Sequence, residues 1–393
     1  MTRDLSEFRK LGLDQFEKAG LPSRKLEDWH YTDLSQTELS KLPLAEEVRG
    51  TAQPGVIHLV NGFLQGKPEL PEGVTLEGLD VAGKHIGSLL LGTDRALTAL
   101  NAGLFNDILV LRVAAKVEKP VEILSEIQGA VQFHGRLLVL VEKDASLTLS
   151  EIHRGQGTDT GAGFANWVAE AFVAEGGVLN HVKLQDEALE TTHVAALGLE
   201  LGKGARYKGA LLHVGAKLAR QEVLTILAGE GADFSLDGGT LAVGTQHIDN
   251  TTRVIHRAPG CPSHQLFKTV LDEQAHGVFQ GTLFVERSGQ KTAAYQMSRA
   301  LMLSDRAAMD NKPELEIYAD DVKCGHGATI GDIDETALFY LKSRGIDDAT
   351  ARRLLIEAFL GEVAATVENQ ALREGLEERL FDKLGALFGR KAA

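Results

Sequence analysis

Residues Pro313–Ala328 read PELEIYADDVKCGHGA, the clearest local pattern in the chain. Apolar Leu315 and Ile317 alternate with polar neighbours, and alternation with period two is typical of a strand with one buried face. If the extended backbone continues without a bulge, Cys324 and His326 share a face, because residues two apart on a strand point to the same side. We therefore expect one strand that carries a thiol and an imidazole side by side.

A thiolate and an imidazole in this arrangement match the ligand preference of a soft or borderline metal ion. Gly325 lies between Cys324 and His326 and leaves the space beside them open. Two residues cannot complete a four-coordinate site, so further ligands must come from elsewhere in the fold or from another chain. The alternative is a buried Cys beside a hydrogen-bonded His. Local sequence alone favours this alternative, because a free Cys often behaves as a small hydrophobe.

The whole chain is acidic and long enough to bury a large core. It has 393 residues, 44% of them hydrophobic, and a formal net charge of −14. This charge argues against a nucleic acid or an anionic membrane as partner, since both select for basic patches. The two cysteines, Cys261 and Cys324, cannot form a disulfide framework and suit a reducing compartment. No apolar signal core or membrane-spanning run occurs, so the sequence predicts a soluble cytoplasmic protein.

Short β-prone runs recur from about residue 108 to residue 317. They are rich in Val, Ile, Leu, Thr and Phe, return at roughly a dozen residues, and are separated by Gly, Asp and Asn. The runs are Ile108–Val113, Val121–Ile127, Leu137–Val141, Leu147–Ile152, Val168–Val173, His193–Leu201, Val223–Leu227 and Val278–Val285. A long β region with little helical spacing indicates a solenoid or a large sandwich. We find no strict internal repeat, which weakens the solenoid interpretation.

The first fifty residues have a helical pattern. Phe8, Phe16 and Ala19 recur at near-helical spacing, and Gly20 ends the run. A second short helical segment is expected over residues 23–32, where a Ser can cap the start. A Gly- and Pro-rich passage from about residue 50 to residue 83 then marks a boundary.

The chain returns to a helical pattern after residue 331. Asp332 with Glu335 resembles a capping box, and Asp347 or Asp348 can cap a second helix. A last helix carries a leucine stripe, formed by Leu372, Leu376, Leu380, Leu384 and Leu387. Such a stripe packs against its own domain more often than against a partner, although a terminal helical module is also a docking surface. We expect an N-terminal helical domain over 1–50, a β core over 51–331 and a C-terminal helical domain over 332–393.

A second cysteine lies between two histidines, in His256-Arg-Ala-Pro-Gly-Cys261-Pro-Ser-His264. Zinc sites usually use paired Cys or His at shorter, regular intervals, and the prolines indicate a turn. A structural role for Cys261 is therefore favoured. A stand-alone zinc protein stays an alternative, as does a carbohydrate-active enzyme with an acidic groove, because carboxylates are plentiful.

One segment comes close to a phosphate-binding loop. Residues 78–85 match G-x-x-x-x-G-K-[ST] except at the last position, where His85 replaces the hydroxyl residue that binds Mg²⁺. We therefore expect this chain itself to bind no nucleotide.

Several longer segments, in order along the chain, point to a known family. They are LPSRKLEDWHYTDL (21–34), DNTTRVIHRAPGCPSHQLFKTVL (249–271), GVFQGTLFV (277–285), QKTAAYQ (290–296), LEIYADDVKCGHGATIGDID (315–334), LFYLKSRGI (338–346) and ARRLLIEAF (351–359). Over nearly its whole length the chain resembles the SufD family, scaffold subunits of the SUF system for iron–sulfur cluster assembly. The paralogous SufB family shares the FYL-x-x-RGI region but has a strand of the type EHEATTSKIG after a CGAHTFP stretch. Here the strand reads VKCGHGATIG and no CGAHTFP occurs, which favours SufD.

This resemblance implies a mainly β fold, a right-handed parallel β-helix core flanked by N- and C-terminal α-helical domains. It also implies a non-catalytic scaffold in a complex of one SufB, one SufD and two copies of the SufC ATPase. The C-terminal helical domain, from about Asp334 onward, would dock SufC. The SufB and SufD cores pair edge to edge in this family, and the nascent cluster is proposed to form near that interface.

The resemblance also assigns roles to the opening stretch. The SufD histidine implicated at the interface matches His326, and the neighbouring cysteine matches Cys324. Both become candidate ligands of a transient Fe–S cluster shared with SufB, which would supply the remaining ligands. ATP-driven dimerisation of SufC would shift the interface and expose these ligands to iron and sulfide. No role is implied for Cys261, and without SufB the free sheet edge predicts a homodimer.

Overall fold

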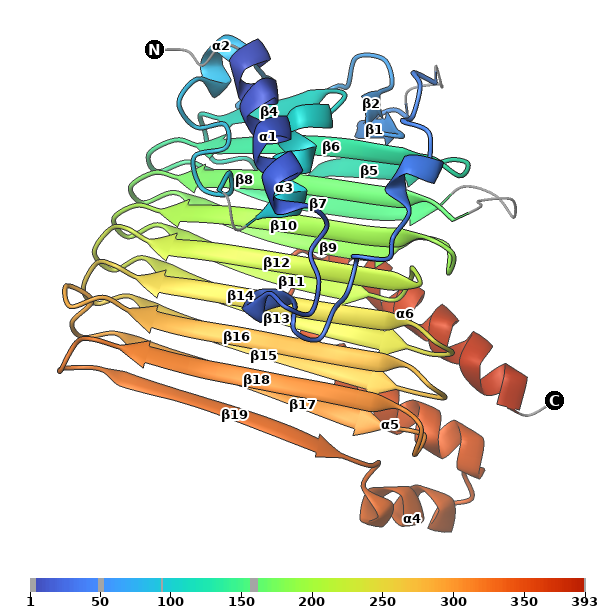
Figure 1. The fold of residues 1–393 in the computed structure, drawn as a ribbon. Coiled ribbons are helices and arrows are strands. Elements are labelled where there is room, and N and C mark those ends of the chain that lie inside the picture. The colour runs from blue at the N-terminus through green and yellow to red at the C-terminus, as the bar shows by residue number, and fades with distance from the viewer. Residues whose placement is uncertain (1–4, 49–52, 93–94, 156–161, 392–393) are drawn as a thin grey trace.

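The protein folds as a β-solenoid, in which the chain winds repeatedly between two facing sheets. The computed structural model describes residues 5–48, 53–92, 95–155 and 162–391. Figure 1 shows the strands stacked from the N-terminal to the C-terminal end, with helices beside the first strands and beside the later ones. The prediction of a mainly β fold is confirmed, and of the two β architectures considered the chain adopts the solenoid.

From β4 onward, consecutive strands lie in opposite sheets, so each coil of the chain adds one strand to each sheet. The ten-stranded sheet contains β1 (Val56–Val60), β2 (Phe63–Leu64), β5 (Val121–Ile127), β7 (Ser146–Gly155), β9 (Val178–Asp186), β11 (Arg206–His213), β13 (Asp233–Ala242), β15 (Pro262–Leu271), β17 (Ala293–Met302) and β19 (Lys323–Gly331). The nine-stranded sheet contains β3 (Val74–Leu76), β4 (Ile108–Val113), β6 (Gln132–Val141), β8 (Phe164–Val173), β10 (Thr192–Leu201), β12 (Leu218–Leu227), β14 (His247–His256), β16 (His276–Val285) and β18 (Ala308–Ile317).

Neighbouring coils are parallel and in register, so equivalent side chains form rows inside the solenoid. Tyr207 of β11 pairs with Phe234 of β13, and their rings stack with centroids 5.5 Å apart. Alternate residues of each strand point inward and form one continuous apolar cluster, as the two-residue period of a strand requires. All eight predicted runs lie within strands.

The coils differ in length, which explains why the sequence shows no strict repeat. Thr192 pairs with Leu218 on the next coil, whereas His276 pairs with Ala308, so the turns between strands vary while the strands stay in register. In a parallel stack the register is set by which alternate residues face the core and which face outward, so it does not require coils of constant length.

Helices pack on the outer face of the nine-stranded sheet near the N-terminal end of the solenoid. The predicted first helix is confirmed as α1 (Leu5–Ala19), which packs on α3 (Ala96–Leu104), a helix that the sequence analysis missed. The two helices approach closely at Gly12, where a Cβ would lie 2.6 Å from the Ala99 carbonyl oxygen. Shorter helical turns are η1 (Glu27–Trp29), η2 (Leu39–Lys41) and α2 (Leu79–Ala82). The predicted boundary at residues 50 and 51 lies outside the described residues.

The second predicted helix, over residues 23–32, is wrong, because only η1 forms there. Contacts with the nine-stranded sheet hold this segment in place of helical hydrogen bonds. The guanidinium of Arg220 on β12 lies 4.0 Å from the centroid of the Trp29 ring. The same group donates to the carbonyl oxygen of Asp28 at 2.6 Å. A buried arginine thus fastens the N-terminal segment to the outer face of the solenoid.

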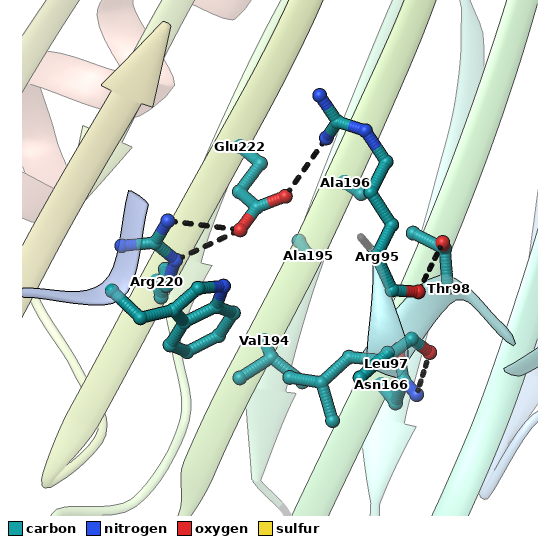
Figure 2. A pocket seen from close by; sticks show the side chains of 11 residues that line it. Arg95, Leu97, Thr98, Asn166, Val194, Ala195, Ala196, Arg220 and Glu222 are labelled. Carbon is teal, nitrogen blue, oxygen red and sulfur yellow. Dashed lines mark hydrogen bonds and ion pairs between the residues drawn. The ribbon is translucent and has the colours of Figure 1, made fainter. Parts of the chain in front are cut away.

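Figure 2 shows the hollow beside this contact. Glu222 accepts hydrogen bonds from Arg220 and from Arg95, each at 3.0 Å. Arg95 immediately precedes α3, so the Glu222 carboxylate links α3 to β12. Through Arg220 it also supports the contact that holds η1 on the same strand. Because its charged groups pair with one another, we assign this hollow a structural role.

Three helices follow the last strand: α4 (Glu335–Ser343), α5 (Asp348–Ala364) and α6 (Gln370–Lys391). Asp334 caps α4 by accepting from the backbone N–H groups of Thr336 and Ala337. The predicted capping box at Asp332 is therefore wrong by two residues. Asp347 caps α5, as one of the two expected alternatives.

The leucine stripe of α6 packs inside the protein. Leu376, Leu380, Leu384 and Leu387 are buried in one apolar cluster with Leu212, Leu241 and Val270, which lie on the outer face of the ten-stranded sheet. The prediction that the stripe packs on its own chain is confirmed. In the part of the chain that the structure describes, no helix has both the length and the apolar content needed to cross a membrane.

Candidate functional site at the open end of the solenoid

The stretch over residues 313–328 forms two strands and a turn, so the prediction of one continuous strand is wrong. β18 ends at Ile317 and β19 begins at Lys323, and the turn carries the chain from one sheet to the other. The carbonyl oxygen of Asp321 accepts from the backbone N–H of Lys291 at 2.6 Å, which fixes the turn on the preceding coil. The polar alternation runs across this change of sheet, and therefore resembled one strand in the sequence.

The last coil leaves both sheets open at one end. Among the described strands, β18 pairs only with β16 and β19 pairs only with β17, so each has a free edge. Figure 1 shows β19 at the end of the stack. Large apolar side chains are exposed in this region, namely Tyr295, Ile317, Tyr318 and Ile330. A free strand edge with exposed apolar side chains is suited to pairing with another chain.

Cys324 and His326 face the interior at this open end. Cys324 lies beside Ala294 in register and His326 beside Gln296, and both partners on β17 are buried. Cys324 is half-buried against the apolar core, whereas His326 is exposed. The structure therefore places the two side chains on one face of β19, with the imidazole at the mouth and the thiol sheltered beside it.

The environment of Cys324 favours its neutral form. Burial raises the pKa of the Cys324 thiol above its usual value. Metal ions bind the thiolate, so an ion at this position must displace the thiol proton. Gly325 has only the Tyr295 ring near the position of a Cβ, at 3.6 Å, which keeps the backbone between the two side chains accessible.

The interior next to His326 is polar and incompletely hydrogen-bonded. Gln265, Gln296 and His326 occupy one row across β15, β17 and β19. Both glutamines are buried. Among the described protein atoms, the side-chain oxygen and nitrogen of Gln265 and the Oε1 of Gln296 have no hydrogen-bond partner. Buried polar atoms normally have partners, so this row offers donors and acceptors to water or to a ligand at the mouth. The sequence analysis missed it because the row depends on the register.

Cys261 and the two histidines near it in sequence do not converge. The Cys261 thiol is buried and donates to the carbonyl oxygen of Gly229 at 3.3 Å. His256 is buried with its Nε2 3.0 Å from the Ser263 hydroxyl, whereas the His264 side chain is exposed. This arrangement fits the structural role that the sequence favoured for Cys261.

A second polar group, which the sequence analysis also missed, lies deep in the solenoid. His153, Lys183, Glu187 and His193 come from β7, β9, the following turn and β10, and all are buried. Burial lowers the pKa of His153 to about 4. Burial opposes ionisation of Glu187, but the charge and hydrogen bond of His193 lower the pKa of that carboxyl to about 2. The group thus presents a neutral imidazole and a carboxylate.

One protein family matches the greater part of this chain. The family model described as SUF system FeS cluster assembly, SufBD core domain, matches residues 124–359, which is more than half of the chain. The chain belongs to the SufBD family. The resemblance drawn from the sequence segments is confirmed, and a role in the SUF system follows from family membership.

Individual members of the SufBD family match most of the chain. The iron–sulfur cluster assembly protein SufD of Escherichia coli is 29% identical over 395 residues, which cover 95% of this chain and 91% of that protein. A SufBD family protein of Synechocystis is 29% identical, covering 91% and 86% of the two chains. Protein ABCI7, chloroplastic, of Arabidopsis thaliana is 30% identical, covering 90% and 80%.

The sheltered thiol gives a first prediction. In a Cys261→Ser variant, Cys324 should react with iodoacetamide at pH 7 more slowly than an unhindered thiol, because burial raises its pKa and lowers the thiolate fraction. The rate, followed by mass spectrometry, should rise as the pH is raised. Reaction at pH 7 as fast as that of a free cysteine peptide would show that the site already holds a thiolate.

Proposed function

We propose that this chain is the SufD-type scaffold subunit of a complex with one SufB and two SufC subunits. Its role is to help form a nascent iron–sulfur cluster where its open end meets SufB. The observation that carries this proposal is the free edge of β18 and β19 with His326 exposed at its mouth. Family membership and the E. coli SufD relative supply the biochemical context.

The chemistry of the open end fits a transient, shared site. His326 offers an accessible imidazole, and Cys324 offers a thiol that can become a thiolate once an ion is present. Two ligands are too few for iron in a cluster, so SufB supplies the others across the paired edge. The cluster is cargo of the complex, and the unpartnered amide atoms of Gln265 and Gln296 lie where they can bind its solvent shell.

The C-terminal helices are the proposed docking site for SufC, which would bind and hydrolyse ATP for the complex. Phe339 and Tyr340 of α4 have exposed side chains, at 73% and 56%. Helices α5 and α6 share a buried cluster with the ten-stranded sheet, so a movement of these helices caused by SufC is transmitted to the sheet. In this role the chain transmits the conformational change, without catalytic activity and without binding a nucleotide itself.

Several finer features belong to the same proposal. The winding is right-handed, as in nearly all parallel crossovers. The terminal segments, 1–50 and 332–393, act as helical domains around a core of residues 51–331. The complex works in the cytoplasm, and without SufB the free edge pairs with a second copy of the chain. The separation of Cys261 from His256 and His264 speaks against the stand-alone zinc alternative, and family membership favours a scaffold over a carbohydrate-active enzyme.

The main test of this proposal is the substitution His326→Ala. Anaerobic co-purification of the chain with SufB and SufC should yield the same complex for wild type and His326→Ala, since the imidazole is exposed and its loss leaves the core intact. Iron and sulfide in the variant should fall severalfold, because one ligand of the nascent site is lost. Thr329→Ala, on the opposite face of the same strand, is the matched control and should load like wild type.

Equal loading of wild type and His326→Ala would make the histidine structural. Failure to recover any complex, with all proteins folded, would contradict the scaffold proposal as a whole.

The docking surface for SufC has its own test. A Phe339→Ala, Tyr340→Ala double variant should bind SufC more weakly by about 2 kcal/mol, roughly 30-fold in affinity, because exposed aromatic anchors dominate such interfaces. Isothermal titration measures the change. Pairing with SufB should be unaffected, and unchanged SufC affinity would place the docking surface elsewhere.

A further inference from the structure

The buried polar group in the middle of the solenoid has the composition of a metal site. His153 lies on β7 of the ten-stranded sheet, His193 on β10 of the nine-stranded sheet, and Glu187 in the turn between β9 and β10. Each side chain offers one ligand atom, and these atoms lie within 4.8 Å of one another. Among the described residues, this is the group of His, Cys, Asp and Glu that comes close enough to share an ion. Neither Cys324 nor His326 belongs to it.

Neighbouring side chains hold two of the three groups in place. The Nδ1 of His193 lies 2.6 Å from Glu187 Oε1, and the amide of Gln185 donates to Glu187 Oε2 at 2.5 Å. The rings of His153 and His193 face each other edge on, with centroids 5.1 Å apart. The hydrogen bond from Gln185 orients a carboxylate ligand from outside the group, as is typical around protein-bound metals, whereas the His193–Glu187 hydrogen bond joins two proposed ligands and gives way to the ion.

His153 provides an independent observation, a buried ring nitrogen that is free to bind an ion. Its Nε2 lies 3.1 Å from Glu151, but its Nδ1 has no hydrogen-bond partner among the described atoms, although the side chain is 1% exposed. A buried nitrogen without a partner is destabilising, and such atoms are uncommon in folded proteins. A bound ion would supply the partner.

Lys183 shows that a cation is accommodated at this point. Its Nζ lies 3.4 Å from His193 Nε2 and 2.7 Å from Gln221 Oε1. An incoming ion would compete with this ammonium. Glu151 lies beside Lys183 in register on β7, so a displaced ammonium has a carboxylate next to it. The interior therefore holds two carboxylates, Glu151 and Glu187, near one lysine.

We propose that His153, Glu187 and His193 form a buried site for one divalent transition-metal ion of the zinc or ferrous class. Two imidazoles and one carboxylate suit these ions, and donors around a tetrahedral ion lie about 3.4 Å apart. Because the ligand atoms lie within 4.8 Å of one another, the widest separation has to close by at most about 1.4 Å. A small cavity lined in part by Glu151, Lys183 and Gln221 lies beside the lysine, so the displaced ammonium has space to move away from the three ligands. The ion would link the two sheets across the interior, independently of the open end.

The test uses the full-length chain and Co²⁺ as a spectroscopic probe for both metals. Protein unfolded in chelator is refolded with Co²⁺, and visible absorption and elemental analysis report binding. Wild type should hold about one ion per chain, which chelator removes slowly because the site is buried. Glu187→Gln and His193→Gln should bind at least about tenfold more weakly.

Matched controls separate this site from others in the chain. His134 on β6 is also buried with an unpartnered Nε2 but has no interaction with this group, so His134→Gln controls for the loss of a buried imidazole. His326→Ala controls for the open end and Cys261→Ser for the other cysteine. All three should bind Co²⁺ like wild type.

Folding of each variant is checked by circular dichroism. Folded wild type that takes up no Co²⁺, or a folded His193→Gln variant that binds it equally, would overturn the proposal and leave a hydrogen-bonded network only. If the ligand variants fail to fold, Lys183→Gln decides. Without the competing ammonium this variant should bind Co²⁺ at least as tightly as wild type, and a folded Lys183→Gln protein without Co²⁺ would equally contradict the site.

Discussion

Backbone hydrogen bonding between parallel, in-register coils is the constraint on which the rest of the structure depends. Each coil satisfies the N–H and C=O groups of the coil before it, from β4 through β19. A stack of this kind is never complete at its ends, because the last coil always has one row of unpaired groups. At the N-terminal end the stack finishes in the short antiparallel strands β2 and β3, whereas at the C-terminal end it finishes in the long strands β18 and β19, each with a free edge among the described residues. The fold thus leaves a free edge, which we propose as the docking surface, as a direct result of how it is held together.

The same register decides where chemistry occurs. Inward-facing residues form rows, and most rows are apolar. The row that ends at His326 is polar, and its two buried members, Gln265 and Gln296, have unpartnered amide atoms. The buried group at His153 and His193 lies several coils away and joins opposite sheets. One solenoid therefore carries an accessible candidate site at its open end and a closed, proposed metal site in its interior.

Local pattern predicted the elements well and their arrangement less well. Ile108–Val113 and Val121–Ile127 were predicted to the residue, because their composition and turn residues carry the signal. The prediction of one strand over 313–328 was wrong because the alternation of polar and apolar residues continues through the turn that joins the two sheets. The proximity of His153 and His193 could not be predicted, since it depends on how far one coil winds before the next strand begins. The common face of Cys324 and His326 needed only local geometry.

Hydrogen–deuterium exchange with and without SufB tests the central claim most directly, because it reads the edge itself. The account predicts that amides of β18 and β19, over residues 308–331, become strongly protected when SufB binds, while α4 and the N-terminal helices exchange as before. Unchanged exchange over residues 308–331 in a complex that has demonstrably formed would contradict it, since SufB would then bind another surface and the open end would not be the place of cluster formation.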